Sequence, residues 1–390
     1  MKKETKRGAA WLLLLFFLTV HVRCTLPAPS QMDLARNLAT RATTYLWAQK
    51  SADGGWHSQT HGLLKSGQAL TPFILHTLLQ ASDNTSVEQK IRKGLQFIRS
   101  NTSRGGVLGV ANPQILEYPN YATSYGLRVL AAFGSAQDSI LIKGMYDYLI
   151  DQQFDLSRSI PADHVAFGGW GFGEQQLPAG QVGYVDLSHT RRVLQSLRAV
   201  SLGDLDTAYS QAKHFLDGLQ NRQLHTVVEK KYYDGGFHYS PVNFLANKGS
   251  VMQLSDEDIF LSYATATCDG LLALAAIGIH EKDPAVVDAL NWLATHDQLA
   301  YPEGIPQDNP AQWHRVMFFY HLAVRAEVYA TYGWPPGTQK AMLSLLDAHI
   351  REDGSFYNVN GAPNKENDPL LATALALSTL QHIINSESTG

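Results

Sequence analysis

The sequence predicts an all-α protein in which six helical hairpins close into a single (α/α)6 toroid. Three observations predict this fold. Helix-like stretches follow one another in pairs along the 390-residue chain. The second stretch of each pair is more apolar than the first. A corner of two glycines and an aromatic residue recurs between the two stretches, as in "SADGGWHSQTHG" at residues 51–62. Self-similarity at a regular spacing is typical of repeat architectures.

The first stretch of each pair is amphipathic, which is typical of a helix with one face in water. These helices are expected over residues 32–50, 87–100, 139–153, 205–222, 284–296 and 339–351. The more apolar helices are expected over residues 66–80, 121–134, 185–200, 261–278, 316–333 and 367–383. A closed double ring covers its inner helices nearly all round and leaves its outer helices facing water. The contrast between amphipathic first helices and apolar second helices therefore favours a closed ring, and a linear solenoid is the alternative.

The recurring corners are predicted to be structural. Glycine permits the tight turn that leaves the first helix of a pair. The aromatic residue is expected to fill the gap between neighbouring hairpins, because a large ring buries much apolar area. The aromatic residues concerned are Trp56, Trp170, Phe237 and Phe356. Inner helices that end at a glycine are expected to take left-handed caps, and these glycines are Gly134, Gly278 and Gly333.

Composition and charge indicate the partners of the chain and the place where it acts. The formal net charge is -4, and basic residues cluster only near the N-terminus, so nucleic acid is not an expected partner. That basic cluster precedes the apolar stretch 9–20, which predicts a signal peptide at residues 1–26 and a secreted or periplasmic protein. An uncleaved membrane anchor is the alternative, with association at a membrane surface. The toroid domain is assigned to residues 30–386.

The segment "ATTYLWAQKSADGGW", residues 42–56, resembles the QW repeat of squalene and oxidosqualene cyclases. Tyr45, Leu46, Gln49, Gly54 and Trp56 stand at the matching positions, with one residue fewer than usual between Leu46 and Gln49. Protein prenyltransferase β-subunits share the same toroid. The chain is most similar to exported bacterial prenyltransferase/squalene-oxidase repeat proteins. The resemblance implies the toroid fold, and it implies an isoprenoid-like substrate if the protein is an enzyme.

The chain departs from the chemistry of these families in several places. The Asp-x-Asp-Asp acid of the cyclases is absent, and the nearest stretch, "SDEDIF" with Asp256 and Asp258, is interpreted as a solvated loop or helix start. "VDLSHTRRVL" resembles the zinc-binding helix start of prenyltransferases, but the family's cysteine precedes its histidine, whereas Cys268 follows His189. No cofactor is therefore expected, and zinc held by Asp186, His189, Cys268 and Asp269 is the alternative. "GFGEQQ" resembles a thioester motif with Phe172 in place of its cysteine, which excludes that chemistry.

The candidate site lies where the inner helices begin. If all six run the same way, their N-termini surround one mouth of the ring. Asp186 and His189 are three residues apart and are predicted as a catalytic acid–base pair on one helix face. The alternative is that Asp186 only caps its helix and that His189 is a core residue. Arg191 and Arg192 are expected to neutralise Asp186. The substrate-binding residues are predicted to be Tyr121, Tyr125, Tyr263, Trp313, His314 and Tyr320.

The functional prediction is an exported toroid that acts on an isoprenoid or another hydrophobic small molecule in its cavity by acid–base chemistry. One alternative is a non-catalytic toroid that binds a lipid or a protein. Another is a carbohydrate-active α/α toroid, which requires paired carboxylates. Asp186 with Asp256 or Asp258 is the pair that the sequence offers for that chemistry.

Overall fold

A computed structural model of the chain describes residues 30–80, 88–112, 114–115, 117–173, 177–222, 233–242, 246–254 and 257–389. The predicted signal peptide and Asp256 lie outside these residues, and the side chain of Asp258 is not described. Among the helices of the described ranges, none combines the length and the apolar character that a membrane span requires.

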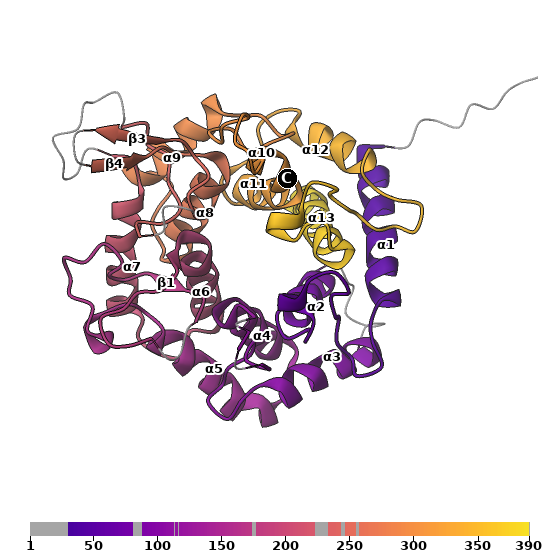
Figure 1. Cartoon of the computed structure of the whole chain (residues 1–390). Coiled ribbons are helices and arrows are strands. Elements are labelled where there is room, and N and C mark those ends of the chain that lie inside the picture. The colour runs from indigo at the N-terminus through magenta and orange to yellow at the C-terminus, as the bar shows by residue number, and fades with distance from the viewer. Residues whose placement is uncertain are drawn as a thin grey trace, which may run out of the picture.

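The described helices form two concentric rings (Figure 1). The inner ring contains α2 (Leu70–Gln80), α4 (Pro119–Phe133), α6 (Leu187–Val200), α8 (Ala264–Ala276), α11 (Phe318–Tyr332) and α13 (Pro369–Asn385). The outer ring contains α1 (Gln31–Ala48), α3 (Glu88–Asn101), α5 (Ser139–Asp151), α7 (Asp206–Leu219), α9 (Pro284–Thr295) and α12 (Thr338–Asp347). Each inner helix contacts the next, and α13 contacts α2 as well as α1, which closes the ring. The predicted α/α toroid is therefore confirmed.

Several short strands and helices lie in the loops between the helices of the two rings. Two antiparallel ribbons, which periodicity did not predict, pair β1 (Trp170–Gly171) with β2 (Val185–Asp186) and β3 (Val251–Leu254) with β4 (Glu257–Phe260). The remaining short elements are helical: η1 (Gly62–Leu64), η2 (Ala136–Asp138), η3 (Leu156–Arg158), α10 (Trp313–Val316), η6 (Ala362–Asn364) and η7 (Ser386–Thr389).

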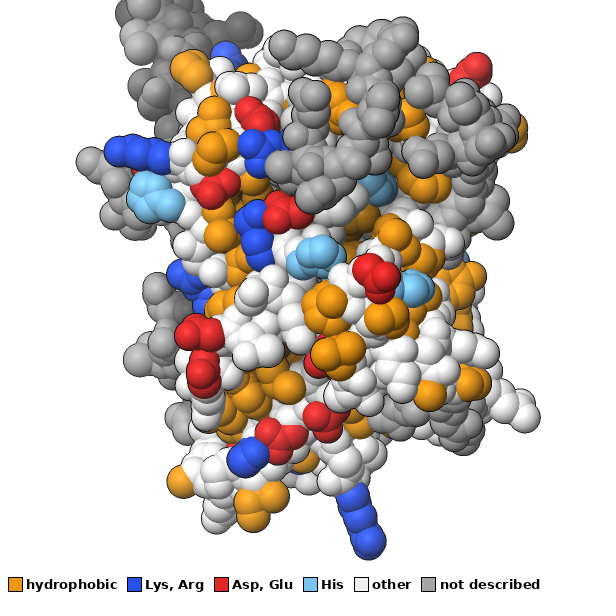
Figure 2. Space-filling view, turned by 90° about the vertical axis from the view of Figure 1, so that its left-hand side faces the viewer, with side chains coloured by type: hydrophobic (Ala, Val, Ile, Leu, Met, Phe, Trp, Pro, Cys, Tyr) orange, Lys and Arg blue, Asp and Glu red, His pale blue; other side chains and the backbone are white. Residues whose placement is uncertain are grey.

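Burial follows the predicted contrast between the two rings. On inner helix α8 nearly every residue is buried, from Ala264 through Ala276. Outer helix α7 buries one stripe, which includes Ala208, Ala212 and Phe215, and exposes Asp206 and His214. Charged side chains of both signs are scattered over the outer face of the molecule that Figure 2 shows. The outer ring thus separates the apolar inner ring from water.

A glycine with positive φ marks each of six corners between an outer and an inner helix, and its φ lies between 79° and 95°. These glycines are Gly54, Gly106, Gly168, Gly235, Gly304 and Gly354. In five of the six, an added Cβ would overlap an outer helix that follows around the ring; for Gly168 it would meet Gln211 of α7, and for Gly354 it would meet Arg41 of α1. Glycine is required here both for the backbone conformation and for this close approach. The corner at Gly304 was missed in the sequence because it lacks a glycine pair and an aromatic residue.

In five of the six corners, a hydrogen-bond pattern fixes the residue two positions after the corner glycine. Trp170 donates its backbone N–H to Thr190 Oγ1 (2.9 Å) on inner helix α6 and its indole N–H to Leu149 O (2.7 Å) on outer helix α5. Threonines Thr71, Thr123, Thr267 and Thr373 accept the equivalent backbone N–H in four other corners. The corner at Gly304 has Pro306 at this position, which has no N–H to satisfy. The structural interpretation of the corners is therefore supported by their contacts.

The structure corrects one position of the resemblance to the QW repeat. Gln153 and Gln220 each donate their side-chain amide to the corner and to the start of the next outer helix, at Ala208 O (2.9 Å) and Ala285 O (2.7 Å) respectively. In the first corner Lys50 Nζ donates instead, to Lys90 O (2.8 Å). Gln49 only caps α1 with its backbone N–H. The short spacing after Leu46 reflects this shift by one residue.

The ends of the inner helices agree only in part with the predicted left-handed caps. Gly278 has a φ of 82° and Gly333 a φ of 114°, both in the region that favours glycine. Gly134 does not, because it is extended with φ -74° and ψ -174°. It donates its N–H to Leu130 O (2.8 Å), and Asp138 lies close enough that a Cβ at Gly134 would meet its carboxylate.

We expect Gly168→Ala to lower the free energy of unfolding by about 2–3 kcal/mol, because alanine is strained at a positive φ and its Cβ meets the backbone of α7. Chemical denaturation measures the change. Gly62→Ala is the matched control: nothing lies within 4 Å of its added Cβ. Equal stability of the two variants would contradict the assigned role of the corner glycine.

Candidate functional site

A cavity of about 560 Å³ opens among the N-terminal ends of the inner helices. Five inner helices contribute to its wall close to their starts, and α8 contributes its N-cap residue Tyr263, so all six run the same way and their N-termini surround one mouth. The wall is rich in aromatic residues. Its aromatic residues are Phe73, Tyr118, Tyr121, Tyr125, Phe172, Tyr184, His189, Tyr239, Tyr263, Trp313 and Tyr320.

Asp186 and His189 form a buried pair at the start of α6. Asp186 Oδ1 accepts the backbone N–H of His189 (2.9 Å) and thereby caps the helix. Its Oδ2 lies 2.8 Å from Nδ1 of the same histidine. Both residues line the cavity. Asp186 therefore caps the helix and orients the imidazole at once, so the two interpretations made from the sequence do not exclude each other.

Backbone pairing and a second hydrogen-bond chain hold Asp186 in place. The ribbon β1–β2 pairs Asp186 with Trp170 of the third corner, so the corner that anchors the hairpin also positions the carboxylate. Ser188 Oγ donates to Asp186 Oδ1 (3.0 Å) and lies 2.8 Å from the hydroxyl of Tyr239. The backbone N–H of Leu187 donates to Tyr239 O (2.9 Å). This support restricts the rotamers of the pair.

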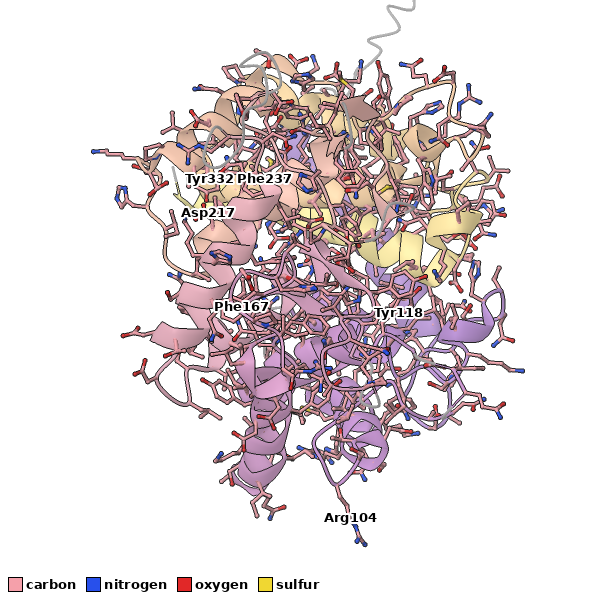
Figure 3. All side chains as sticks on the ribbon, turned by 60° about the vertical axis from the view of Figure 1, so that its left-hand side comes forward. Arg104, Tyr118, Phe167, Asp217, Phe237 and Tyr332 are labelled. Carbon is pink, nitrogen blue, oxygen red and sulfur yellow. The ribbon has the colours of Figure 1, made fainter. Side chains whose placement is uncertain are left out.

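The far side of the His189 ring faces aromatic groups and has no polar partner. Its ring centroid lies 4.7 Å from that of Phe172 and 5.0 Å from that of Tyr121. Tyr118 stacks at 6.1 Å. Figure 3 shows Tyr118 within the molecule, whereas Arg104 projects from its edge. Among the described residues, Nε2 of His189 is buried without a hydrogen-bond partner. A buried polar atom without a partner requires an explanation, and a catalytic role is one such explanation.

Electrostatics keep the carboxyl group of Asp186 ionised. Burial acts to raise its pKa, but the nearby His189 and the hydrogen bonds from His189 and Ser188 outweigh burial, so the pKa lies below its ordinary value. An ionised Asp186 accepts the Nδ1–H of the imidazole, which leaves Nε2 as the ring nitrogen that can exchange a proton. The pair is thus arranged to take up a proton at Nε2 and to return it.

Arg191 and Arg192 do not neutralise Asp186 as expected. Arg191 is fully buried and pairs with Asp269 (2.5 Å) of α8 and with Glu327 of α11. Arg192 lies 3.6 Å from Glu327 and points toward Tyr121. Successive residues of an α-helix point in different directions, about 100° apart, so neither arginine shares the face of Asp186. Arg191 thus connects α6 with α8 and α11, and Arg192 lines the cavity beside Tyr121.

The structure brings together five of the six predicted substrate-binding residues. Those that line the cavity are Tyr121, Tyr125, Tyr263, Trp313 and Tyr320. His314 is not part of the wall: it is buried, and its ring lies edge-on to Tyr301 at 6.4 Å. It follows Trp313 directly on the single turn of α10 and so points away from the cavity.

Loop residues of the wall were missed in the sequence because only helix starts were considered. Phe172 was noted solely as the residue that rules out a thioester, yet it stacks on Tyr184 (4.8 Å, 9° between planes) and packs on His189. Tyr118 and Tyr239 come from the loops before α4 and α8. The density of aromatic residues in these loops was the available signal.

The proposed zinc ligands do not assemble. Cys268 is fully buried on α8, and burial raises the pKa of its thiol to about 11, which opposes the thiolate that zinc requires. Asp269 is occupied by Arg191 and by the hydroxyl of Tyr320 (2.8 Å). Across the described ranges, no three His, Cys, Asp or Glu side chains are grouped so that they could hold a metal ion.

Solved structures with the same fold are similar at low sequence identity. A variant of type II terpene cyclase MstE from Scytonema, in complex with geranylgeranyl dihydroxybenzoate as substrate, is 14% identical with a TM-score of 0.54, over 91% of this chain and 98% of that chain. Apo MstE is 15% identical with a TM-score of 0.53, over 90% and 98%. The GH76A alpha-1,6-mannanase from Salegentibacter sp. HEL1_6 is 11% identical with a TM-score of 0.51, over 92% and 99%.

No protein-family model and no curated protein matches the sequence. The solved structures nevertheless show that the chain has an α/α toroid fold like that of terpene cyclases, as the resemblance in sequence implied. The same fold in a mannanase demonstrates that the fold alone does not identify a substrate. The function must be argued from the residues of the site.

Proposed function

We propose that the toroid binds a hydrophobic small molecule of isoprenoid type in its cavity and transforms it by acid–base catalysis at His189. The observation that carries this proposal is the unpaired Nε2 of His189, a residue that lines the aromatic-rich cavity and whose Nδ1 is held by Asp186. The imidazole accepts or donates the proton. Asp186 is a positioning residue that fixes the orientation of the ring and stabilises the imidazolium.

The cavity wall supports the choice of a hydrophobic substrate. Its volume of about 560 Å³ falls within the range of about 300–1,000 Å³ of small-molecule sites. Leu70, Phe73, Leu371 and Leu375 extend the aromatic wall with apolar surface. Apolar walls with few convergent polar groups favour a ligand that is mostly hydrocarbon. Type II terpene cyclase MstE, which acts on a geranylgeranyl compound, supports the same class by fold analogy.

A carbohydrate-active function receives less support. Glycoside hydrolysis uses two carboxyl groups about 5–9.5 Å apart. Within the described part of the cavity wall, Asp186 is the one carboxylate, and it is already bound to His189. For the Salegentibacter mannanase, a variant with two consecutive aspartates replaced by asparagine is called inactive. This sequence contains no two consecutive aspartates.

We also propose that the protein is exported from the cytoplasm. It rests on the basic and apolar pattern of residues 1–26, which matches a signal peptide. A protein that acts beyond the cytoplasm meets hydrophobic substrates at membrane surfaces, so a membrane surface is the partner from which the cavity is expected to be loaded. Nucleic acid remains outside the proposal because the chain has a slight acidic excess.

Ligand binding in the cavity can be followed through Trp313, which lines it. Titration of the full chain with farnesol, a neutral isoprenoid probe, is expected to give a saturable change in tryptophan fluorescence. Trp313→Phe should remove most of this change, since the reporting indole is then absent. Trp334→Phe is the matched control, because Trp334 packs against Tyr329 and does not line the cavity. No saturable signal in the wild type, or the same signal in Trp313→Phe, would contradict the proposed binding site.

A further inference from the structure

Two lysines enter the mouth of the cavity from loops that precede different inner helices. Lys248 precedes α8 and Lys365 precedes α13. Nζ of Lys248 lies 4.5 Å from the ring centroid of Trp313 and 5.3 Å from that of Tyr239. Nζ of Lys365 lies 5.2 Å from the ring centroid of Tyr118, which precedes α4. Both ammonium groups therefore rest on aromatic faces of the wall.

Neither lysine has a carboxylate partner among the described residues. The ion pairs of the structure involve other cations, and the polar contact of Lys248 is a backbone oxygen, that of Ala246. Enclosure lowers the pKa of Lys248 to about 8, although the negative charge of Asp186 opposes this shift. Its ammonium group has thus lost hydration that a bound anion would replace.

The charges on the described wall do not balance. Arg192, Lys248 and Lys365 are cationic, and Asp186 is the one carboxylate. Arg192 is compensated by Glu327, and Asp186 is bound to His189. With Arg192 offset by Glu327, the two lysines and the ionised Asp186 leave an excess of one positive charge on the described wall. A purely hydrocarbon ligand would leave this excess charge at the mouth without an anion.

We propose that Lys248 and Lys365 bind the anionic head of an amphiphilic substrate, a carboxylate or a phosphate, at the mouth of the cavity while the aromatic wall holds its apolar tail. This inference rests on the proposed function, since it names the head group of the molecule that the cavity binds. Charged hydrogen bonds from lysine ammonium groups favour either head group. The tail then extends from the mouth past His189.

Three probes with the same tail test the inference: farnesol, farnesoic acid and farnesyl phosphate. We expect at least one of the two anionic probes to bind the wild-type chain about tenfold more tightly than farnesol, a difference of about 1.4 kcal/mol. The head group with the larger gain identifies the source of the anion. The gain should decrease with added salt, because the lysines are partly exposed.

The double variant Lys248→Met/Lys365→Met should lose this gain and keep its affinity for farnesol. Lys282→Met/Lys340→Met is the matched control, since Lys282 before α9 and Lys340 on α12 are both exposed outside the cavity wall and the change in net charge is the same. Thermal unfolding verifies that both double variants fold. If farnesol binds but neither anion gains affinity, or if the gain survives in the double variant, the head-group assignment is wrong and the cavity proposal stands. If no probe binds the wild type, the proposed function itself fails.

Discussion

Replacing His189 by glutamine is expected to lower the turnover number by about 10²–10⁴-fold, the usual contribution of a general acid–base residue. Glutamine approximates the length of the imidazole and can still donate to Asp186, but it cannot accept and return a proton. Ligand binding should be retained, since the aromatic wall around Tyr121 and Phe172 is unchanged. The measurement is kcat and KM on isoprenoid substrates, with products identified by mass spectrometry.

The variant Asp186→Asn tests the role of Asp186, which orients the His189 ring, separately from proton transfer at His189 itself. The amide oxygen of asparagine can still cap α6, so folding should be retained. The charge that stabilises the imidazolium is lost, so kcat should fall and its dependence on pH should change while KM stays similar. Ser188→Ala serves as a control in the same hydrogen-bond chain, with a smaller expected loss. Unchanged turnover in both His189→Gln and Asp186→Asn, with ligand still bound, would indicate a non-catalytic binding toroid.

Replacing Arg191 by methionine is expected to destabilise the fold by about 3–5 kcal/mol, because it leaves the buried carboxylate of Asp269 without its cation and removes one of the two cations beside Glu327. Asp269 is fully buried, and Glu327 lies at the same network on α11. The guanidinium of Arg191 connects α6 to both of their helices. Guanidinium denaturation of the full chain measures the loss.

Arg198→Met is the matched control for Arg191→Met. Arg198 is exposed on the same helix and donates to the backbone oxygens of Ala275 and Ala276. Its loss should cost about 1 kcal/mol or less. The double variant Arg191→Met/Asp269→Leu should recover part of the stability, since the buried carboxylate that lost its cation is then removed as well. A loss below about 1 kcal/mol for Arg191→Met would contradict the role assigned to the network.

The fold could be predicted from the sequence because every hairpin must meet the same requirements: an apolar inner helix, an amphipathic outer helix and a tight corner between them. Helical periodicity located the inner and outer helices, and the glycine pairs located the corners at Gly54, Gly168 and Gly235. The corner at Gly304 was not predicted because its sequence differs from the motif of the other corners. Pro306 stands where the other corners have a residue whose N–H forms a hydrogen bond, although the turn itself is the same. The short spacing after Leu46 indicated a slip of one residue at Gln49, but only the contact of Lys50 shows which side chain takes the place of the glutamine.

The parts of the candidate site that could be predicted are those whose residues lie close together in the sequence. Asp186 and His189 lie within one helical turn, so their spacing placed them together. The partners of Arg191 come from α8 and α11, far along the chain, and no local pattern points to them. Lys248 and Lys365 lie in loops whose positions depend on closure of the ring. These contacts are set by tertiary packing and become visible only in three dimensions.

The most direct test of the central claim is an experimental structure of the full chain with farnesol at saturating concentration. We expect the isoprenoid chain inside the ring, in contact with Tyr121 and Phe172, with one of its atoms about 3–3.5 Å from Nε2 of His189. An empty cavity at saturation, or farnesol bound on the outer face alone, would contradict the assignment of this cavity as a site for hydrophobic substrates.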